Sequence, residues 1–103
     1  MGIDLQMVNE RGEVLERIYD PHHTVMKILS AAPDFDESIC LRFIDRYGDT
    51  VFNQSQIAIL REELLSVPDS SLESRARAHK QEMLELAKKA EAKVHTYLKF
   101  YGD

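Results

Sequence analysis

Apolar and polar residues alternate at the start of the chain, which is the pattern of half-buried strands. A turn signal, Asn9-Glu10-Arg11-Gly12, divides this stretch, because asparagine opens such turns and glycine accepts the left-handed residue that closes them. Residues 3–19 are therefore predicted to form a β-hairpin with Val8 opposite Val14. In that register the core face carries Ile3, Leu5, Met7, Leu15 and Tyr19.

A helix is predicted next, with Asp20 as its N-cap and Pro21 as its first residue. A second hairpin is predicted over residues 39–52, around the turn Asp45-Arg46-Tyr47-Gly48. Its core face carries Ile39, Leu41, Phe43 and Val51. Asn53 and Gln56 then have the spacing of a capping box, which predicts the start of a second helix.

The two hairpin–helix units align at an offset of 36 residues, so that Leu5 matches Leu41 and Gly12 matches Gly48. This predicts a ββα–ββα pseudo-repeat, although two unrelated hairpins with one turn type would look the same. Together with the helix described below, the pattern predicts an α+β fold with one antiparallel sheet. The 103 residues form a single domain, with a body over 1–69 and a C-terminal helix over 70–103.

Residues 72–101 contain no glycine or proline and are rich in strong helix formers, so one long helix is predicted there. Such a helix would be about 45 Å long, against a diameter of about 34 Å for a compact domain of this size. We therefore expect apolar residues on the overhang to be covered by a second copy, as a homodimer. A bend that folds the helix back is the alternative. The interface candidates on this helix are Leu84, Val94, Tyr97, Leu98 and Tyr101.

The tip of the second predicted turn is a further contact candidate. Tyr47 is expected to be exposed there beside Arg46, and aromatic and arginine side chains anchor many interfaces. Asp45 and Asp49 flank the same turn and could approach one another, although ordinary turn chemistry also explains both carboxylates.

Charge and composition exclude several classes of function. The net charge is −5, which argues against nucleic acid as the main partner. No apolar run is long enough to span a membrane, and the start of the chain lacks the pattern of a signal peptide. A single cysteine, Cys40, cannot form an internal disulfide, so a cytoplasmic location is predicted.

No constellation typical of catalysis or metal binding is found. The neighbours His22 and His23 would point about 100° apart on a helix and would not chelate one ion together. Glycine-rich phosphate loops and nucleophile motifs are missing from the sequence. We therefore expect no catalytic residues, no metal and no cofactor.

The stretch from Leu41 to Gln54, with Phe43-Ile44-Asp45 and Tyr47-Gly48-Asp49-Thr50-Val51-Phe52-Asn53 inside it, resembles a segment of small single-domain bacterial proteins. The first hairpin is similar to them as well, so the resemblance covers about half the chain. These proteins have no assigned activity and often belong to mobile or accessory genetic elements. The resemblance implies an interaction role and no catalytic residues.

These observations predict an acidic, non-enzymatic interaction protein, for example an inhibitor or immunity-type protein that captures a basic partner. One alternative is a small-molecule-binding domain or enzyme with a pocket between sheet and helices, using His22, His23, Tyr19 and Asp45. A further alternative is a transcription accessory factor that uses the basic side of the long helix.

Overall fold

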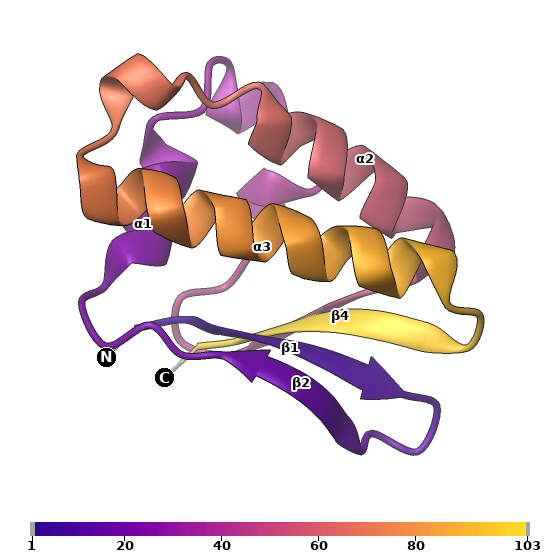
Figure 1. Cartoon of the computed structure of the whole chain (residues 1–103). Helices are drawn as coiled ribbons and strands as arrows, with labels where there is room; N and C mark the ends of the chain where they lie inside the picture. The colour runs from indigo at the N-terminus through magenta and orange to yellow at the C-terminus, as the bar shows by residue number, and fades with distance from the viewer. Residues whose placement is uncertain (1, 103) are drawn as a thin grey trace.

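Four antiparallel strands form one sheet in the order β2-β1-β4-β3, and the helices lie on one side of it (Figure 1). The computed structural model describes residues 2–102. The strands are β1 (Asp4–Asn9), β2 (Val14–Ile18), β3 (Asp49–Phe52) and β4 (Thr96–Tyr101). The α-helices are α1 (Thr24–Ser30), α2 (Gln54–Leu65) and α3 (Ser74–Ala92), with short 3-10 helices η1 (Phe35–Glu37), η2 (Leu41–Phe43) and η3 (Asp69–Ser71). The predicted α+β class with an antiparallel sheet and a long helix near the C-terminus is confirmed.

The first hairpin forms where it is predicted, as β1 and β2. The side chain of Asn9 accepts hydrogen bonds from the backbone N–H groups of Arg11 and Glu13, each at 3.0 Å. Gly12 has φ 80°, in the left-handed region that only glycine adopts without strain. The turn residues thus account for the hairpin.

A register shift between Met7 and Val8 changes which side chains of β2 face the core. Val14 lies opposite Val8 as predicted, but beyond the shift Ile18 pairs with Leu5. Such an irregularity turns the following residues to the other face of the sheet. Leu15 and Tyr19, predicted in the core, are therefore exposed.

Helix α1 begins at Thr24, later than predicted, because Asp20 caps it from outside the helix. The Asp20 carboxylate accepts the backbone N–H of Thr24 at 2.6 Å and that of Val25 at 3.2 Å. It also accepts the N–H of Ile3 at 3.0 Å, which ties the start of β1 to the helix. A buried carboxylate with three backbone donors satisfies groups that the helix end would otherwise leave unpaired.

The predicted hairpin over 39–52 is wrong in its first half. The carboxylate of Glu63, on α2, accepts the N–H groups of Ile39, Cys40 and Leu41 at 2.6, 2.8 and 3.2 Å, and this segment turns into η2. Residues 49–52 do form a strand, β3, but it pairs with β4. The ββα–ββα pseudo-repeat is consequently not confirmed.

Helix α2 begins as predicted. The Asn53 side chain accepts the N–H of Gln56 at 3.0 Å, and the Gln56 side chain accepts the N–H of Asn53 at 2.9 Å. This reciprocal pair is the capping box expected from the sequence.

The predicted helix over 72–101 is too long, because α3 ends at Ala92 and the chain reverses into β4. Lys93 has extended backbone angles, and His95 has φ 59°. Helix α3 measures about 28 Å at 1.5 Å per residue, and it lies along the sheet inside a body with a longest extent of 37 Å. The overhang that led us to expect a homodimer is therefore not present in residues 2–102.

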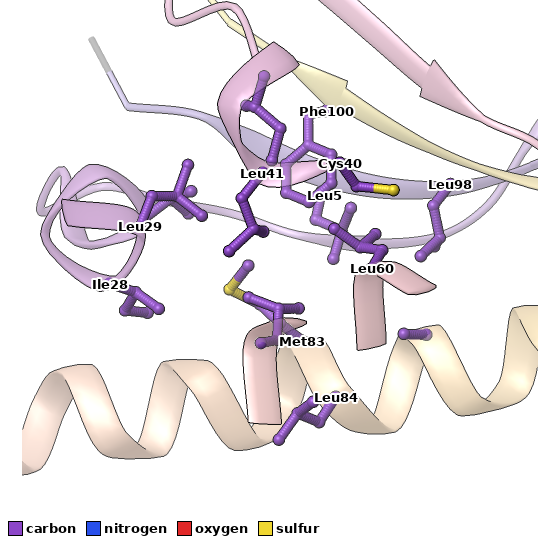
Figure 2. Close-up of a cluster of buried hydrophobic side chains, with 14 of the residues drawn as sticks. Leu5, Ile28, Leu29, Cys40, Leu41, Leu60, Met83, Leu84, Leu98 and Phe100 are labelled. Carbon is purple, nitrogen blue, oxygen red and sulfur yellow. The ribbon is translucent and has the colours of Figure 1, made fainter. Parts of the chain in front are cut away.

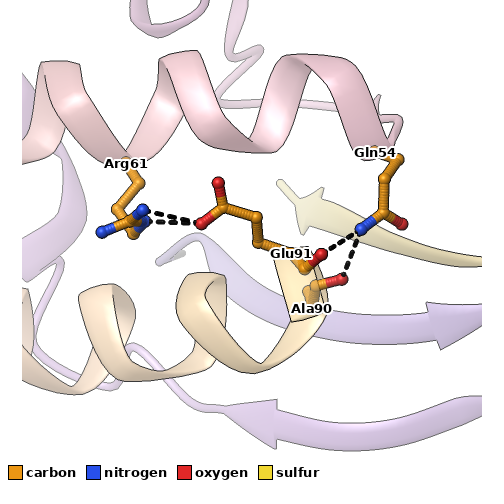
Figure 3. Close-up of polar contacts among 4 residues, drawn as sticks. All are labelled: Gln54, Arg61, Ala90 and Glu91. Carbon is orange, nitrogen blue, oxygen red and sulfur yellow. Dashed lines mark hydrogen bonds and ion pairs between the residues drawn. The ribbon is translucent and has the colours of Figure 1, made fainter. Parts of the chain in front are cut away.

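Side chains from α2 hold the C-terminal end of α3 in place (Figure 3). The amide nitrogen of Gln54 donates to the carbonyls of Ala90 and Glu91 at the end of α3, where the Ala90 carbonyl also accepts the backbone N–H of Lys93. Arg61 pairs with the Glu91 carboxylate at 2.7 Å. These contacts fix the point at which α3 stops and β4 starts.

The core fills the space between the helices and the sheet (Figure 2). Leu5 of β1 and Leu98 and Phe100 of β4 point toward α3, where Met83 is fully buried. Because strand side chains alternate in direction, the opposite face of the sheet carries Asp4, Gln6 and Val8 of β1 and Tyr97, Lys99 and Tyr101 of β4.

Candidate interaction surface

The face of the sheet that points away from the helices is the candidate functional surface, and we call it the open sheet face (Figure 1). Directly opposed residues of antiparallel strands share a face, so the strand pairings define its members. They are Val14 and Arg17 of β2, Asp4, Gln6 and Val8 of β1, Tyr97, Lys99 and Tyr101 of β4, and Asp49 and Val51 of β3.

Several apolar and aromatic side chains on the open sheet face are exposed to solvent, although Val8, on the inner strand β1, is only 5% exposed. The exposed fractions are 45% for Val14, 52% for Val51 and 45% for Tyr101, and Tyr19, directly after β2, is 65% exposed. Tyrosine combines a large apolar ring with a polar tip and is enriched in protein interfaces. The surface therefore resembles a protein-binding face in its chemistry.

The two cations on this face are held by contacts within the chain. Lys99 pairs with Asp49 at 3.3 Å. Arg17 donates to the Gln6 side chain at 2.6 and 3.2 Å when the Gln6 amide is oriented with its oxygen toward the guanidinium. Each cation also lies over a tyrosine ring, with Arg17 5.4 Å from the Tyr19 centroid and Lys99 5.7 Å from the Tyr101 centroid.

A cavity of about 380 Å³ lies at one end of the open sheet face. Its described lining consists of Gly2, Asp4, Tyr19, Asp20, Pro21, His23 and Tyr101. A second cavity of about 230 Å³ shares Gly2, Asp20 and His23 with the first, and adds Ile3, Met26, Arg46 and Tyr47. The first cavity therefore borders the open sheet face, and the second, next to it, borders the loop that precedes β3.

The predicted contact residues fall into four groups. Asp49, Tyr97 and Tyr101 lie on the open sheet face, and Asp45, Arg46 and Tyr47 lie in the exposed loop before β3. Val94 is exposed between α3 and β4. Leu84 and Leu98, in contrast, are buried in the chain's own core and are not available to a partner.

Asp45 and Asp49, which flank the second predicted turn, each have their own partner. Asp45 accepts the N–H of Tyr47 at 2.8 Å, which is ordinary turn chemistry, and Asp49 is engaged by Lys99. Of the four polar residues proposed for a small-molecule pocket, Tyr19 and His23 line the first cavity, whereas His22 and Asp45 line neither of the two cavities.

Cys40 is poorly suited to nucleophilic chemistry. Burial, and next the negative charge of Glu63, raise the pKa of the Cys40 thiol to about 11. The reactive thiolate is therefore scarce at neutral pH. Across residues 2–102, no three histidine, cysteine or carboxylate side chains gather closely enough to hold a metal ion.

Sequence reasoning missed the open sheet face because it assigned β4 to a helix. The signal was present, since Thr96-Tyr97-Leu98-Lys99-Phe100-Tyr101 alternates between core and outward positions and is rich in strand formers. Within residues 2–102, no helix has both the length and the apolar character required to cross a bilayer.

Comparison with known proteins gives no assignment. No protein-family model matches the chain, and neither do any curated protein or any solved structure. The resemblance of residues 41–54 to small bacterial proteins thus stays a prediction, and the proposal below depends on the surface itself.

Proposed function

We propose that this chain is a non-enzymatic interaction protein that binds a basic partner protein through the open sheet face. The observation that carries the proposal is the exposure of Val51 and Tyr101 on the side of the sheet opposite the helices, together with the exposed Tyr19, which lines the first cavity beside Tyr101. Contiguous exposed apolar groups with a polar rim are typical of binding surfaces.

The filled core favours an interaction protein over the alternative, a small-molecule-binding domain with a pocket between sheet and helices. Leu5, Met83 and Phe100 meet in that space with almost no exposed surface (Figure 2). The first cavity lies instead beside the open sheet face, where a partner would contact it, while a cavity of about 230 Å³ between β2 and α3 is lined largely by charged side chains such as Glu16, Glu82 and Lys89.

The charge distribution supports a basic partner. The chain has a net charge of −5, while Arg17 and Lys99 on the open sheet face are already engaged by Gln6 and Asp49. The long-range field of an acidic protein accelerates the approach of a cationic one and weakens as salt increases. Nucleic acid, which carries the same sign of charge as the chain, is disfavoured by the same argument.

The test begins with a photo-reactive residue at position 51, which captures the natural partner on the open sheet face. The purified partner is then titrated against the wild-type protein, Val51→Glu and the control Leu65→Glu, which changes an exposed leucine on α2. We expect Val51→Glu to weaken binding at least about ten-fold, since a charge at an interface centre is costly, and Leu65→Glu to bind normally.

Equal affinities of the wild-type protein and Val51→Glu would overturn the proposal, and so would capture of nucleic acid instead of protein. Association rates at low and high salt provide a second readout. The association rate constant should fall steeply between 20 and 200 mM salt, about ten-fold or more for a steered pair.

A further inference from the structure

The first cavity combines carboxylates with tyrosine rings. In the sheet, Tyr101 lies directly between Asp4 of β1 and Asp49 of β3. Tyr19 lines the cavity together with Tyr101 and Asp4, and none of the described lining residues is a lysine or arginine. The cavity therefore offers carboxylates and tyrosine rings, and the cations that lie over the same rings, Arg17 and Lys99, are outside its described lining.

The carboxylate of Asp4 is the group that can accept a new ion pair. One of its oxygens accepts the N–H of Asp20 at 2.9 Å, which orients the side chain and leaves the second oxygen for a ligand. Asp20, in contrast, is buried and uses both oxygens on three backbone donors. Asp4 is half-buried, so a charge placed beside it is only partly screened by water.

The tyrosines of this cavity already bind cations within the chain, as Arg17 over Tyr19 and Lys99 over Tyr101 show. A tyrosine ring attracts a cation through its quadrupole, and a flat guanidinium can stack on it while its N–H groups reach a carboxylate. Because both rings line the cavity together with Asp4, we expect an incoming cation to find the same two kinds of contact there.

We propose that this cavity binds an arginine or lysine side chain of the partner protein, between the rings of Tyr19 and Tyr101 and against the Asp4 carboxylate. The inference rests on the proposed function and names the partner's anchoring residue. It agrees with the net charge of the chain, and the cavity of about 380 Å³ has room for one long side chain.

The experiment is an NMR titration of the full chain with N-acetyl-arginine methylamide, compared with the citrulline analogue, which has the same shape and no charge. We expect saturable shifts at the amides of Asp4, Tyr19 and Tyr101, with a dissociation constant in the millimolar range typical of one anchoring side chain. The citrulline analogue should bind at least about five-fold more weakly, because it lacks the cation.

Two charge-matched variants locate the effect. Asp4→Asn keeps an oxygen for the Asp20 N–H and should weaken arginine binding about five-fold or more. Asp36→Asn, which removes an exposed carboxylate on η1, should leave binding unchanged. Absence of saturable shifts, equal binding of the two ligands or equal effects of the two variants would overturn the inference.

The same variants separate this inference from the proposed function. If the purified partner binds Asp4→Asn normally but loses affinity for Val51→Glu, the cavity inference is wrong and the proposed function stands. If the partner binds both variants normally, both proposals are wrong.

Discussion

The two turn regions of the chain share a sequence pattern but not a structure. Asn9-Glu10-Arg11-Gly12 closes a hairpin between β1 and β2, whereas Asp45-Arg46-Tyr47-Gly48 precedes a strand that pairs with β4. Both turns begin with a side chain that accepts a backbone N–H two residues later. Local turn chemistry is therefore not sufficient to decide which strands pair.

Contacts from distant parts of the chain explain the difference. Upstream of the second turn, Glu63 takes the N–H groups that a strand would use, and downstream Gly48 accepts the N–H of Gly102 at 2.8 Å. Strand β3 does contact the segment before the turn, but through the Thr50 hydroxyl, which accepts the Asp45 N–H at 2.9 Å and donates to the Phe43 carbonyl at 3.4 Å. The Thr50 side chain thus makes the hydrogen bonds that backbone groups would make between the two strands of a hairpin.

A substitution in β4, the strand that pairs with β3 in place of residues 39–44, should have the largest effect on stability. Phe100 of β4 is fully buried, and its ring meets that of Phe52 edge-on at 5.9 Å. Phe100→Ala should lower the free energy of unfolding by about 4 kcal/mol through lost burial and a cavity. Urea denaturation followed by circular dichroism measures this, with Tyr101→Phe as a control expected within about 0.5 kcal/mol of wild type.

Glu63→Ala tests the contact that prevents a strand at residues 39–41. It should lower the free energy of unfolding by about 2 kcal/mol, because three backbone donors lose a charged acceptor. Glu62→Ala, at an exposed neighbouring site, is the matched control and should change it by less than about 0.5 kcal/mol. Equal losses in the two variants would show that Glu63 does not determine this segment.

The two turn glycines should respond differently to alanine. Gly12→Ala should cost about 1 kcal/mol, because Gly12 has φ 80°. At Gly48 φ is not positive, and a methyl group would meet only the movable carboxylate of Asp45, at 2.9 Å. Gly48→Ala should therefore cost less, about 0.5 kcal/mol or below. A larger loss at Gly48 than at Gly12 in thermal unfolding would contradict this comparison.

The smallest expected change in stability concerns Cys40, whose backbone N–H donates to the Glu63 carboxylate. Its folded pKa is about 11 against 9.0 for an ordinary thiol, so the folded state retains the thiol proton to higher pH. The stabilisation of the folded state that comes from this pKa difference is fully present below pH 9 and is lost as the pH rises toward 11. Relative to Cys40→Ala, wild-type protein should therefore become less stable over that interval, as urea midpoints at pH 7, 9 and 11 would show.

Iodoacetamide labelling gives a second measure of the same thiol. At pH 8 the folded protein should react at least about ten-fold more slowly than the chain in urea. Equal labelling rates would mean that Cys40 is accessible and ionises normally.

The sequence predicts those elements whose determinants are local. The Asn9–Gly12 turn and the Asn53–Gln56 capping box involve side chains and backbone groups within four residues, and both form as predicted. Val25, Ile28 and Leu29 of α1 have the local spacing of a helix face, and all three are buried.

Non-local determinants explain the predictions that were wrong. The end of α3 depends on Gln54, which lies 36 residues before Ala90 and caps the helix through its amide. The register shift in the first hairpin, which exposes Tyr19, has no signature in the alternating pattern. The open sheet face could therefore be only partly anticipated, through Tyr97, Tyr101 and Asp49, while Leu84 and Leu98 belong to the core.

The position of β4 has a consequence for how the protein is made. Residues 96–101 occupy an inner place in the sheet, yet the ribosome adds them after every other strand. Until they emerge, the β1–β2 hairpin is an isolated pair of marginal stability, and β3 has no strand to join. Folding of this sheet must then await the synthesis of residues 96–101, and the contacts between distant segments that complete it form slowly.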